Sequence, residues 1–294
     1  MFMSKLMKSC LAAAAAAVFA AALPAQTPAP ASTSATQDLG AWWDRSSLSY
    51  PRMPTEFLFH GTGNVHWMNA QGNTEGNVYG GGLSLIFRKR RFTDDFFETL
   101  QKNSITYAFN AGSAHFTENT LLNQLDFDLT PHVMAVAGVE DYRNTMIFMD
   151  RRLTEYGGVG YTPKASEQFY LNLIAAVGHS SFLFDRNGID AINPAIVASL
   201  PTLSPGSAGG DLIENLRYKI TPAVSLEQSA SYMKYDQSIL GHRWEFAANF
   251  VIPVSKRLSV MPGYQIKDEA NVYTTALHLK PQDRTFNLGL GITF

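Results

Sequence analysis

Hydrophobic and polar residues alternate along much of the chain with a period of two, which is the period of a β-strand. The clearest case is the segment 285–294, in which even positions carry only Phe, Leu or Ile and odd positions carry Thr, Asn or Gly. Such a strand has one apolar face and one small, polar face. This pattern is typical of an edge strand in a soluble sandwich. It is equally typical of a membrane-barrel strand, which has lipid outside and a polar lumen inside.

Twelve segments alternate in this way between turn signals, and they predict twelve strands. The seventh is among the clearest, because Phe169, Leu171, Leu173, Ala175 and Val177 all fall on one face. The predicted strands are 56–70, 77–88, 103–114, 119–129, 133–143, 153–162, 168–181, 211–220, 224–235, 240–252, 258–268 and 283–294.

The connections between these segments fall into two length classes. Short connections follow even-numbered strands, at 130–132, 163–165, 221–223 and 254–257. Longer ones follow odd-numbered strands, at 144–152, 182–209 and 269–282. Outer-membrane barrels have short periplasmic turns, longer outer loops and an even number of strands. The sequence therefore predicts an all-β fold, a transmembrane antiparallel up-and-down β-barrel of about 12 strands, over residues 53–294.

The first residues of the chain predict export. Residues 1–25 contain Lys5 and Lys8 followed by an alanine-rich apolar stretch, which is the pattern of a secretory signal peptide. Residues 26–52 are rich in Pro, Ala, Ser and Thr and predict a flexible periplasmic leader. Within this leader, Trp42 and Trp43 are interpreted as interfacial anchors, as a lumen plug, or as part of a poorly ordered tail. The only cysteine, Cys10, lies in the signal, so no disulfide is expected in the mature protein.

Composition excludes several classes of protein. The 23 basic residues are balanced by 25 acidic ones, which argues against a nucleic-acid partner. Outside the first residues there is no apolar run of about 18 residues, the length that a spanning helix needs. Neither a cofactor nor a metal is expected. His60 and His66 share a strand face with Glu56, but six residues of strand span about 20 Å, too far for one metal ion.

Polar residues at inward positions predict the lining of the lumen. Both charge signs occur among them, which is compatible with a water-filled pore or with a lumen closed by side-chain pairs. The 182–209 segment is unusually apolar and is expected to fold into the mouth. The run 88–91 is expected to be a solvated periplasmic turn. The predicted lumen-lining residues are His60, His66, Asp126, Asp128, Arg217, Lys219, Glu227, Arg243, Glu245 and Gln265.

One catalytic alternative is present in the sequence. His179, Ser181 and Asn193 have the spacing of the base, nucleophile and orienting residue of the outer-membrane phospholipase, which is itself a twelve-stranded barrel. Strand parity places His179 and Ser181 on the lipid side, where a base beside a serine could activate the nucleophile. The surrounding sequence does not otherwise resemble that enzyme, and we expect the protein not to be an enzyme.

Four short motifs resemble the salt-induced outer-membrane protein family (domain of unknown function 481). They are 71–74 before a glycine-rich strand, 125–131, 157–161 and 288–294, and their order and spacing carry the resemblance over about residues 58–294. The resemblance implies an outer-membrane barrel without assigned chemistry, either a narrow pore or a structural barrel.

The expected location is the bacterial outer membrane, and the expected partners are its lipid and the barrel-assembly machinery; the oligomeric state stays open. The last strand is similar to the signals by which bacterial barrels are recognised for insertion. The expected assembly signal consists of Phe286, Leu288, Leu290, Ile292 and Phe294.

Overall fold

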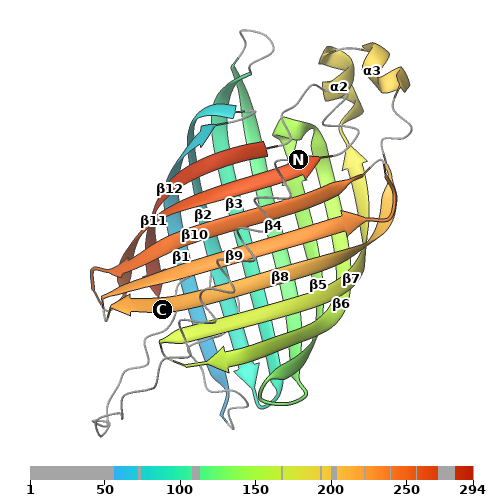
Figure 1. Ribbon diagram of the computed structural model, residues 1–294. Helices are drawn as coiled ribbons and strands as arrows, with labels where there is room; N and C mark the ends of the chain where they lie inside the picture. Colours follow the sequence, from blue (N-terminus) through green and yellow to red (C-terminus); the bar gives the residue numbers. More distant parts are fainter. Residues whose placement is uncertain are drawn as a thin grey trace, which may run out of the picture. The chain divides into compact units, whose positions relative to one another are not determined.

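The computed structural model describes residues 56–71, 74–107, 113–166, 168–192, 194–199, 204–221, 223–238, 240–255, 257–270 and 282–293. Within these ranges the chain forms twelve antiparallel strands that close into one barrel (Figure 1). Each strand pairs with its neighbours in sequence, and β12 pairs with β1 to close the ring. The structure thus confirms the predicted all-β, up-and-down barrel of 12 strands.

Within the described ranges, three short helical elements accompany the strands, and all follow odd-numbered strands: η1 (Thr145–Ile147), α2 (Arg186–Ile192) and α3 (Pro194–Ser199). In the described part of the chain, no helix is both long and apolar enough to cross a membrane. The strands are β1 (Leu58–Gln71), β2 (Thr74–Lys89), β3 (Phe92–Tyr107), β4 (Ser113–Asp128), β5 (Val133–Asn144), β6 (Met149–Ala165), β7 (Phe169–Phe184), β8 (Gly206–Thr221), β9 (Val224–Tyr235), β10 (His242–Pro253), β11 (Leu258–Ala270) and β12 (Gln282–Thr293).

Several predicted features lie outside the described residues. These are the signal peptide and leader over 1–52, including Trp42 and Trp43, together with Asn193 and Phe294.

The predicted bounds of the third and fourth strands were wrong. β3 begins at Phe92 rather than near 103, because Arg90 and Arg91 alone turn the chain, with Arg90 in the left-handed region at φ 53°. β4 begins at Ser113 rather than near 119. The start of β3 does not alternate, because the polar Asp94 stands at an outward position. There its Oδ1 accepts a 2.7 Å hydrogen bond from Asn123 on β4.

Short connections follow the even-numbered strands, as predicted, but the one expected at 163–165 lies at 166–168, because β6 continues to Ala165. They lie at 90–91, 129–132, 166–168, 222–223 and 254–257, and we name this end of the barrel the turn end. Hydroxyls accept backbone N–H bonds at four of these turns: Thr130 Oγ1 accepts from His132 and Val133, and Ser255 Oγ accepts from Arg257 and Leu258. Ser166 Oγ accepts from Phe169, and Thr221 Oγ1 accepts from Ala223. Such local bonds satisfy backbone donors that the sheet ladder leaves over.

The opposite end, which we name the loop end, has connections of more varied length. The predicted 144–152 loop is shorter than expected, because β6 already begins at Met149. The connection from β7 to β8, residues 185–205, carries α2 and α3 (Figure 1).

Side-chain parity divides every strand into an inner and an outer face. In β7 the outward positions from Leu173 to Leu183 are mostly exposed, whereas the inward positions are buried. Val177 is 72% exposed, and the neighbouring inward Ala176 is buried. The barrel therefore exposes apolar side chains on the outside and buries polar ones within, the reverse of a water-soluble globular fold.

Large side chains fold over glycines on the inner wall. Met134 covers Gly160, and the ring of Tyr156 covers Gly138, so a Cβ at either glycine would collide with the covering side chain. Met134 and Tyr156 belong to a buried apolar cluster from β5 to β8 that also contains Val136, Ile174, Ala176 and Ile213. This cluster fills part of the interior and leaves the remainder to polar groups.

Two adjacent glycines on β6 allow a test of this packing. A Cβ at Gly158 would lie 2.3 Å from the carbonyl oxygen of Ala175, whereas one at Gly157 would meet the nearest atom, Val136 O, at 3.7 Å. We expect Gly158→Ala to destabilise the barrel by about 1–3 kcal/mol, because backbone of β7 must move. Gly157→Ala should change stability little. Urea unfolding of both variants in detergent micelles measures the difference, and equal midpoints would contradict the packing described.

Candidate functional site

Charged side chains gather on the inner face near the loop end. We name this group the lumen bridge. Strand parity places all of its members inside, at even positions of β4, β5 and β6 and at odd positions of β10 and β11. The lumen bridge consists of Glu118, Glu140, Tyr142, Arg152, Arg243, Glu245, Lys267 and Glu269.

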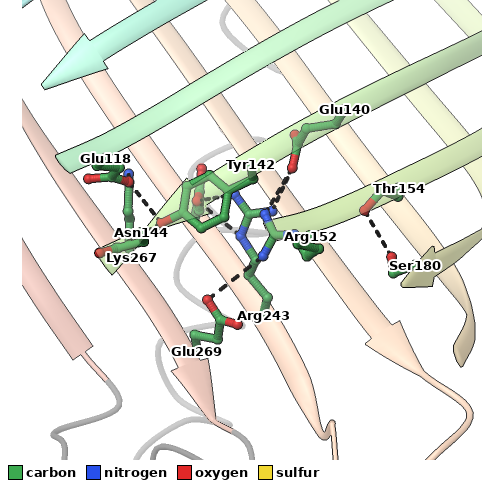
Figure 2. Close-up of polar contacts among 11 residues, drawn as sticks. Glu118, Glu140, Tyr142, Asn144, Arg152, Thr154, Ser180, Arg243, Lys267 and Glu269 are labelled. Atoms are coloured by element: carbon green, nitrogen blue, oxygen red, sulfur yellow. Dashed lines mark hydrogen bonds and ion pairs between the residues drawn. The ribbon is translucent and has the colours of Figure 1, made fainter. Parts of the chain in front are cut away.

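Arg152 is the most deeply buried member of the lumen bridge, with no exposed side-chain surface. Its Nη2 donates a 2.8 Å hydrogen bond to Glu140 Oε1, and its Nη1 lies 3.8 Å from Glu269 Oε2. The guanidinium stacks over Tyr142, with Cζ 4.4 Å from the ring centroid (Figure 2). Burial of a charge is costly unless opposite charges and hydrogen bonds compensate for lost water, and Arg152 has both.

Arg243 and Lys267 reach the opposite wall. Arg243 Nη1 lies 3.3 Å from Glu140 Oε1, and Arg243 also donates to Glu245 on its own strand. Lys267 donates to Glu118 (Figure 2). Four strands separate β10 from β5 around the ring, and four separate β11 from β4. These ion pairs therefore cross the lumen rather than join neighbouring strands.

Tyr142 connects the two cross-lumen contacts. Its hydroxyl donates a 2.9 Å hydrogen bond to Glu118 Oε1 and accepts one of 3.0 Å from Asn144. Its ring also lies 5.5 Å from the Arg243 guanidinium carbon and 6.0 Å from Lys267 Nζ. Cations within about 6 Å of an aromatic face are attracted to its negative quadrupole. The lumen bridge is thus one connected polar network that narrows the interior.

A cavity of about 250 Å³ lies inside the barrel next to the lumen bridge. At about 30 Å³ per molecule, it has room for about eight waters. All of its lining residues lie on strands, and amide and hydroxyl groups such as Gln124, Thr154, Asn172 and Asn249 are prominent among them. Of the predicted lumen residues, those that line it are His66, Asp126, Arg217, Glu227, Arg243, Glu245 and Gln265.

Three predicted lumen residues have other positions. Asp128 lies on the inner face near the turn end, where its Oδ2 accepts a 2.8 Å bond from Arg88. Lys219 is on β8 at the same parity as Arg217. His60 lies on β1, but its side chain is outside the described part.

The interpretation of 88–91 as a solvated run was wrong for one residue. Lys89, Arg90 and Arg91 are exposed, but Arg88 is only 3% exposed and is ion-paired to Asp128. Arg88 is the last inward position of β2, so its side chain enters the barrel instead of the solvent.

Sequence reasoning missed much of the lumen bridge. Glu140, Tyr142 and Lys267 fall at inward positions of strands that were predicted with nearly correct bounds, so parity alone could have found them. Glu118 and Arg152 were missed because each lies just before the predicted start of its strand. Contacts such as Lys267 with Glu118 join residues 149 positions apart, and nothing local in the sequence indicates them.

The 182–209 segment does not form the constriction in its described part. Ile189 is fully buried, and Asp185 N donates to Phe148 O in the neighbouring connection. None of the residues that line the cavity comes from α2 or α3. Among the described residues, strand side chains narrow the lumen.

The catalytic alternative receives no geometric support from the described contacts. His179 and Ser181 both face outward on β7, as parity predicted. No hydrogen bond joins them among the described residues, and Asn193 lies outside those residues. In the same described ranges, no group of three or more His, Cys, Asp or Glu residues could hold a metal ion.

Comparison with known proteins does not identify a family for this chain. No family model and no curated protein matches the sequence, so the resemblance to the salt-induced outer-membrane protein family stays a prediction. Among solved structures, an outer membrane channel from Pseudomonas putida F1 is 14% identical, covers 83% of this chain and 98% of its own, and has a TM-score of 0.49. The NanC porin is 10% identical, covers 78% of this chain and 98% of its own, and has a TM-score of 0.48. The translocator domain of the autotransporter NalP from Neisseria meningitidis is 9% identical, covers 80% of this chain and 88% of its own, and has a TM-score of 0.45.

Adjacent arginines on β6 test the energetics of the lumen bridge. Removing one partner of a buried ion pair costs about 3–5 kcal/mol, so we expect Arg152→Gln to lower unfolding stability by about that amount. Arg151 pairs with Asp141 on the outer face and is 53% exposed, so Arg151→Gln should cost about 1 kcal/mol or less. Urea titration in detergent micelles compares the two variants, and a small effect at Arg152 would show that its pairing contributes little.

Proposed function

We propose that the protein is a bacterial outer-membrane barrel whose lumen forms a narrow polar passage for small hydrophilic solutes. The observation that carries the proposal is the combination of an apolar outer surface with a charged interior that encloses a polar cavity, in one closed barrel. The outer surface supports the membrane location, and the interior supports the passage.

The outer surface supports the membrane location. Soluble monomers rarely expose contiguous apolar patches larger than a few hundred Å². Here outward apolar side chains occur all around the ring, and four of the residues expected to form an assembly signal, on β12, are among them. The exposed apolar side chains include Val65, Tyr79, Leu125, Val159, Val177, Leu212, Phe250, Phe286, Leu288, Leu290 and Ile292.

Aromatic residues concentrate at the turn end. Phe59 and Phe87 pack at 5.1 Å, Phe92 and Phe127 at 4.9 Å, and Phe169 and Tyr218 at 6.5 Å between ring centroids. All six lie on strands close to the short turns. Aromatic girdles at membrane interfaces are a feature of outer-membrane barrels. Their position supports placing the turn end at a membrane interface, and its short turns are those expected on the periplasmic side.

The interior supports a passage that is narrow at rest. Eight-stranded barrels are filled by side chains, whereas barrels of sixteen strands leave an aqueous channel. This twelve-stranded barrel lies between these cases, because an apolar cluster fills one part and a polar cavity occupies another. The lumen bridge then limits how large a solute can pass.

Placing arginine on either face tests the membrane location. Arg on the lipid face near the bilayer midplane costs about 2–4 kcal/mol, so Val177→Arg should sharply reduce the assembled protein in the outer-membrane fraction. Ser229→Arg introduces the same charge beside the inner cavity and should be better tolerated. Assembled protein is measured by fractionation and by the faster migration of unheated samples on a gel. Recovery of the unaltered protein in the soluble periplasm would contradict the proposed membrane location.

Removing one ion pair without changing net charge tests the passage. Arg243→Ala with Glu245→Ala deletes two side chains of the lumen bridge while Glu140 keeps Arg152 as its partner. We expect the unaltered protein to have a small single-channel conductance in planar bilayers. The double variant should conduct severalfold more, because the constriction widens. The matched control, Arg151→Ala with Asp141→Ala, removes an ion pair from the outer face and should leave conductance unchanged. If neither the unaltered protein nor the widened variant conducts, the barrel is a closed structural element.

A further inference from the structure

Two polar side chains interrupt the apolar outer face of β8 and β9. Strand parity places Glu214 at an outward position of β8, between the outward residues Leu212 and Leu216. Gln228 is outward on β9, where it is paired with Leu216 across the ladder. Apolar outward residues therefore surround both polar side chains along the strands.

The position of Glu214 along β8 places it well inside the proposed membrane. Tyr218, which follows on the same face toward the turn end, belongs to the aromatic pairs at that end. The strand from Tyr218 to Glu214 is about 13 Å long. With a strand tilt of about 40° and an apolar band about 25 Å tall, Glu214 lies about 10 Å from the interface. At this depth lipid offers acyl chains and no hydrogen-bond donor.

Glu214 and Gln228 bond to each other but retain unused hydrogen-bonding groups. Gln228 Nε2 donates a 3.2 Å hydrogen bond to Glu214 Oε1. Among the described residues, the other oxygen of Glu214 accepts no hydrogen bond, and the second amide N–H of Gln228 donates none. Polar groups in hydrocarbon are costly without partners, and those in membrane proteins are usually covered by protein or face a polar cavity. A protein partner is therefore expected on this outer face.

Alanines beside the two polar side chains allow such a partner to approach. Ala230 is paired with Glu214 across the β8–β9 ladder, and Ala248 is paired with Gln228 across the β9–β10 ladder. Both alanines are outward by parity. Small side chains let surfaces come close together inside a membrane. We name Glu214, Gln228, Ala230 and Ala248 the outer patch.

We infer that the outer patch binds the same patch of a second copy of this chain. The patch is self-complementary, because it presents an unused acceptor beside an unused donor. In a dimer with a two-fold axis along the membrane normal, Gln228 of each copy can donate to Glu214 of the other. Two-fold contacts of this kind are the commonest in homo-oligomers. The inference rests on the proposed membrane location, and it leaves the passage through each barrel open.

Association of the full-length protein in lipid vesicles tests the inference. Förster transfer between differently labelled copies, measured over a series of protein-to-lipid ratios, gives the dissociation constant of the dimer. We expect Glu214→Leu with Gln228→Leu to raise this constant by about tenfold to hundredfold, the effect of losing two hydrogen bonds in a membrane. The control Glu98→Leu removes an outward carboxyl group from β3 and should leave the constant unchanged.

Cross-linking in the outer membrane identifies the partner. Ala230→Cys places a thiol in the outer patch, and a short thiol cross-linker should join two copies of the chain. The control Leu125→Cys places a thiol on the outer face of β4, where no cross-linked dimer is expected. A cross-link from the outer patch to a different protein overturns the second copy as the partner.

The outcomes separate the dimer from the membrane location. The double Leu variant makes the outer face more apolar, and faster migration of unheated samples confirms that it has folded. Barrels that insert but stay monomeric at every ratio, or that associate equally well after the double substitution, overturn the dimer and leave the membrane location standing. Recovery of the unaltered protein in the soluble periplasm overturns both.

Discussion

Pairing of buried charges across the lumen is the constraint on which the interior depends. Arg152, Arg243 and Lys267 are held among carboxylates from both walls, and none of these charges could be buried at acceptable cost without the others. The network fixes the distance between opposite walls, while the strand ladders fix only the distance between neighbours. It also explains why Tyr142 stands at the centre, since its ring and hydroxyl contact both signs of charge.

The barrel interior is divided between packing and solvent. From β5 to β8, Met134 and Tyr156 cover glycines on adjoining strands, so apolar volume replaces lumen there. Elsewhere the inner face mixes polar side chains with a few apolar ones, such as Leu122, Met233 and Met261, and the cavity remains. Twelve strands enclose more space than these side chains fill, so the composition of the inner face, more than strand number, determines the width of the passage.

The two-residue alternation of apolar and polar positions was enough to predict most of the strands from the sequence. Such alternation is strict, because a slip of one residue would move apolar side chains from the lipid face into the lumen. β5, β9 and β11 were therefore placed almost to the residue. The start of β3 was not predicted, because Asp94 interrupts the apolar face beside the turn end, where an outward polar group can reach water. The lumen bridge could be predicted only as a set of inward charges. Its contacts join residues 103 and 149 positions apart, and side-chain reach across a closed ring has no local sequence signal.

The cross-lumen contacts have a consequence for the order of assembly. β4 and β5 come to face β10 and β11 only when the sheet curls fully and β12 pairs with β1. Until that moment Arg152 and its carboxylate neighbours sit on one side of an open, hydrated sheet, and their dehydration must coincide with the last pairing event. A half-curled intermediate would have neither the water that solvates these charges in the open sheet nor the ion pairs of the finished barrel. Closure is therefore expected to be cooperative, and such an intermediate should be short-lived.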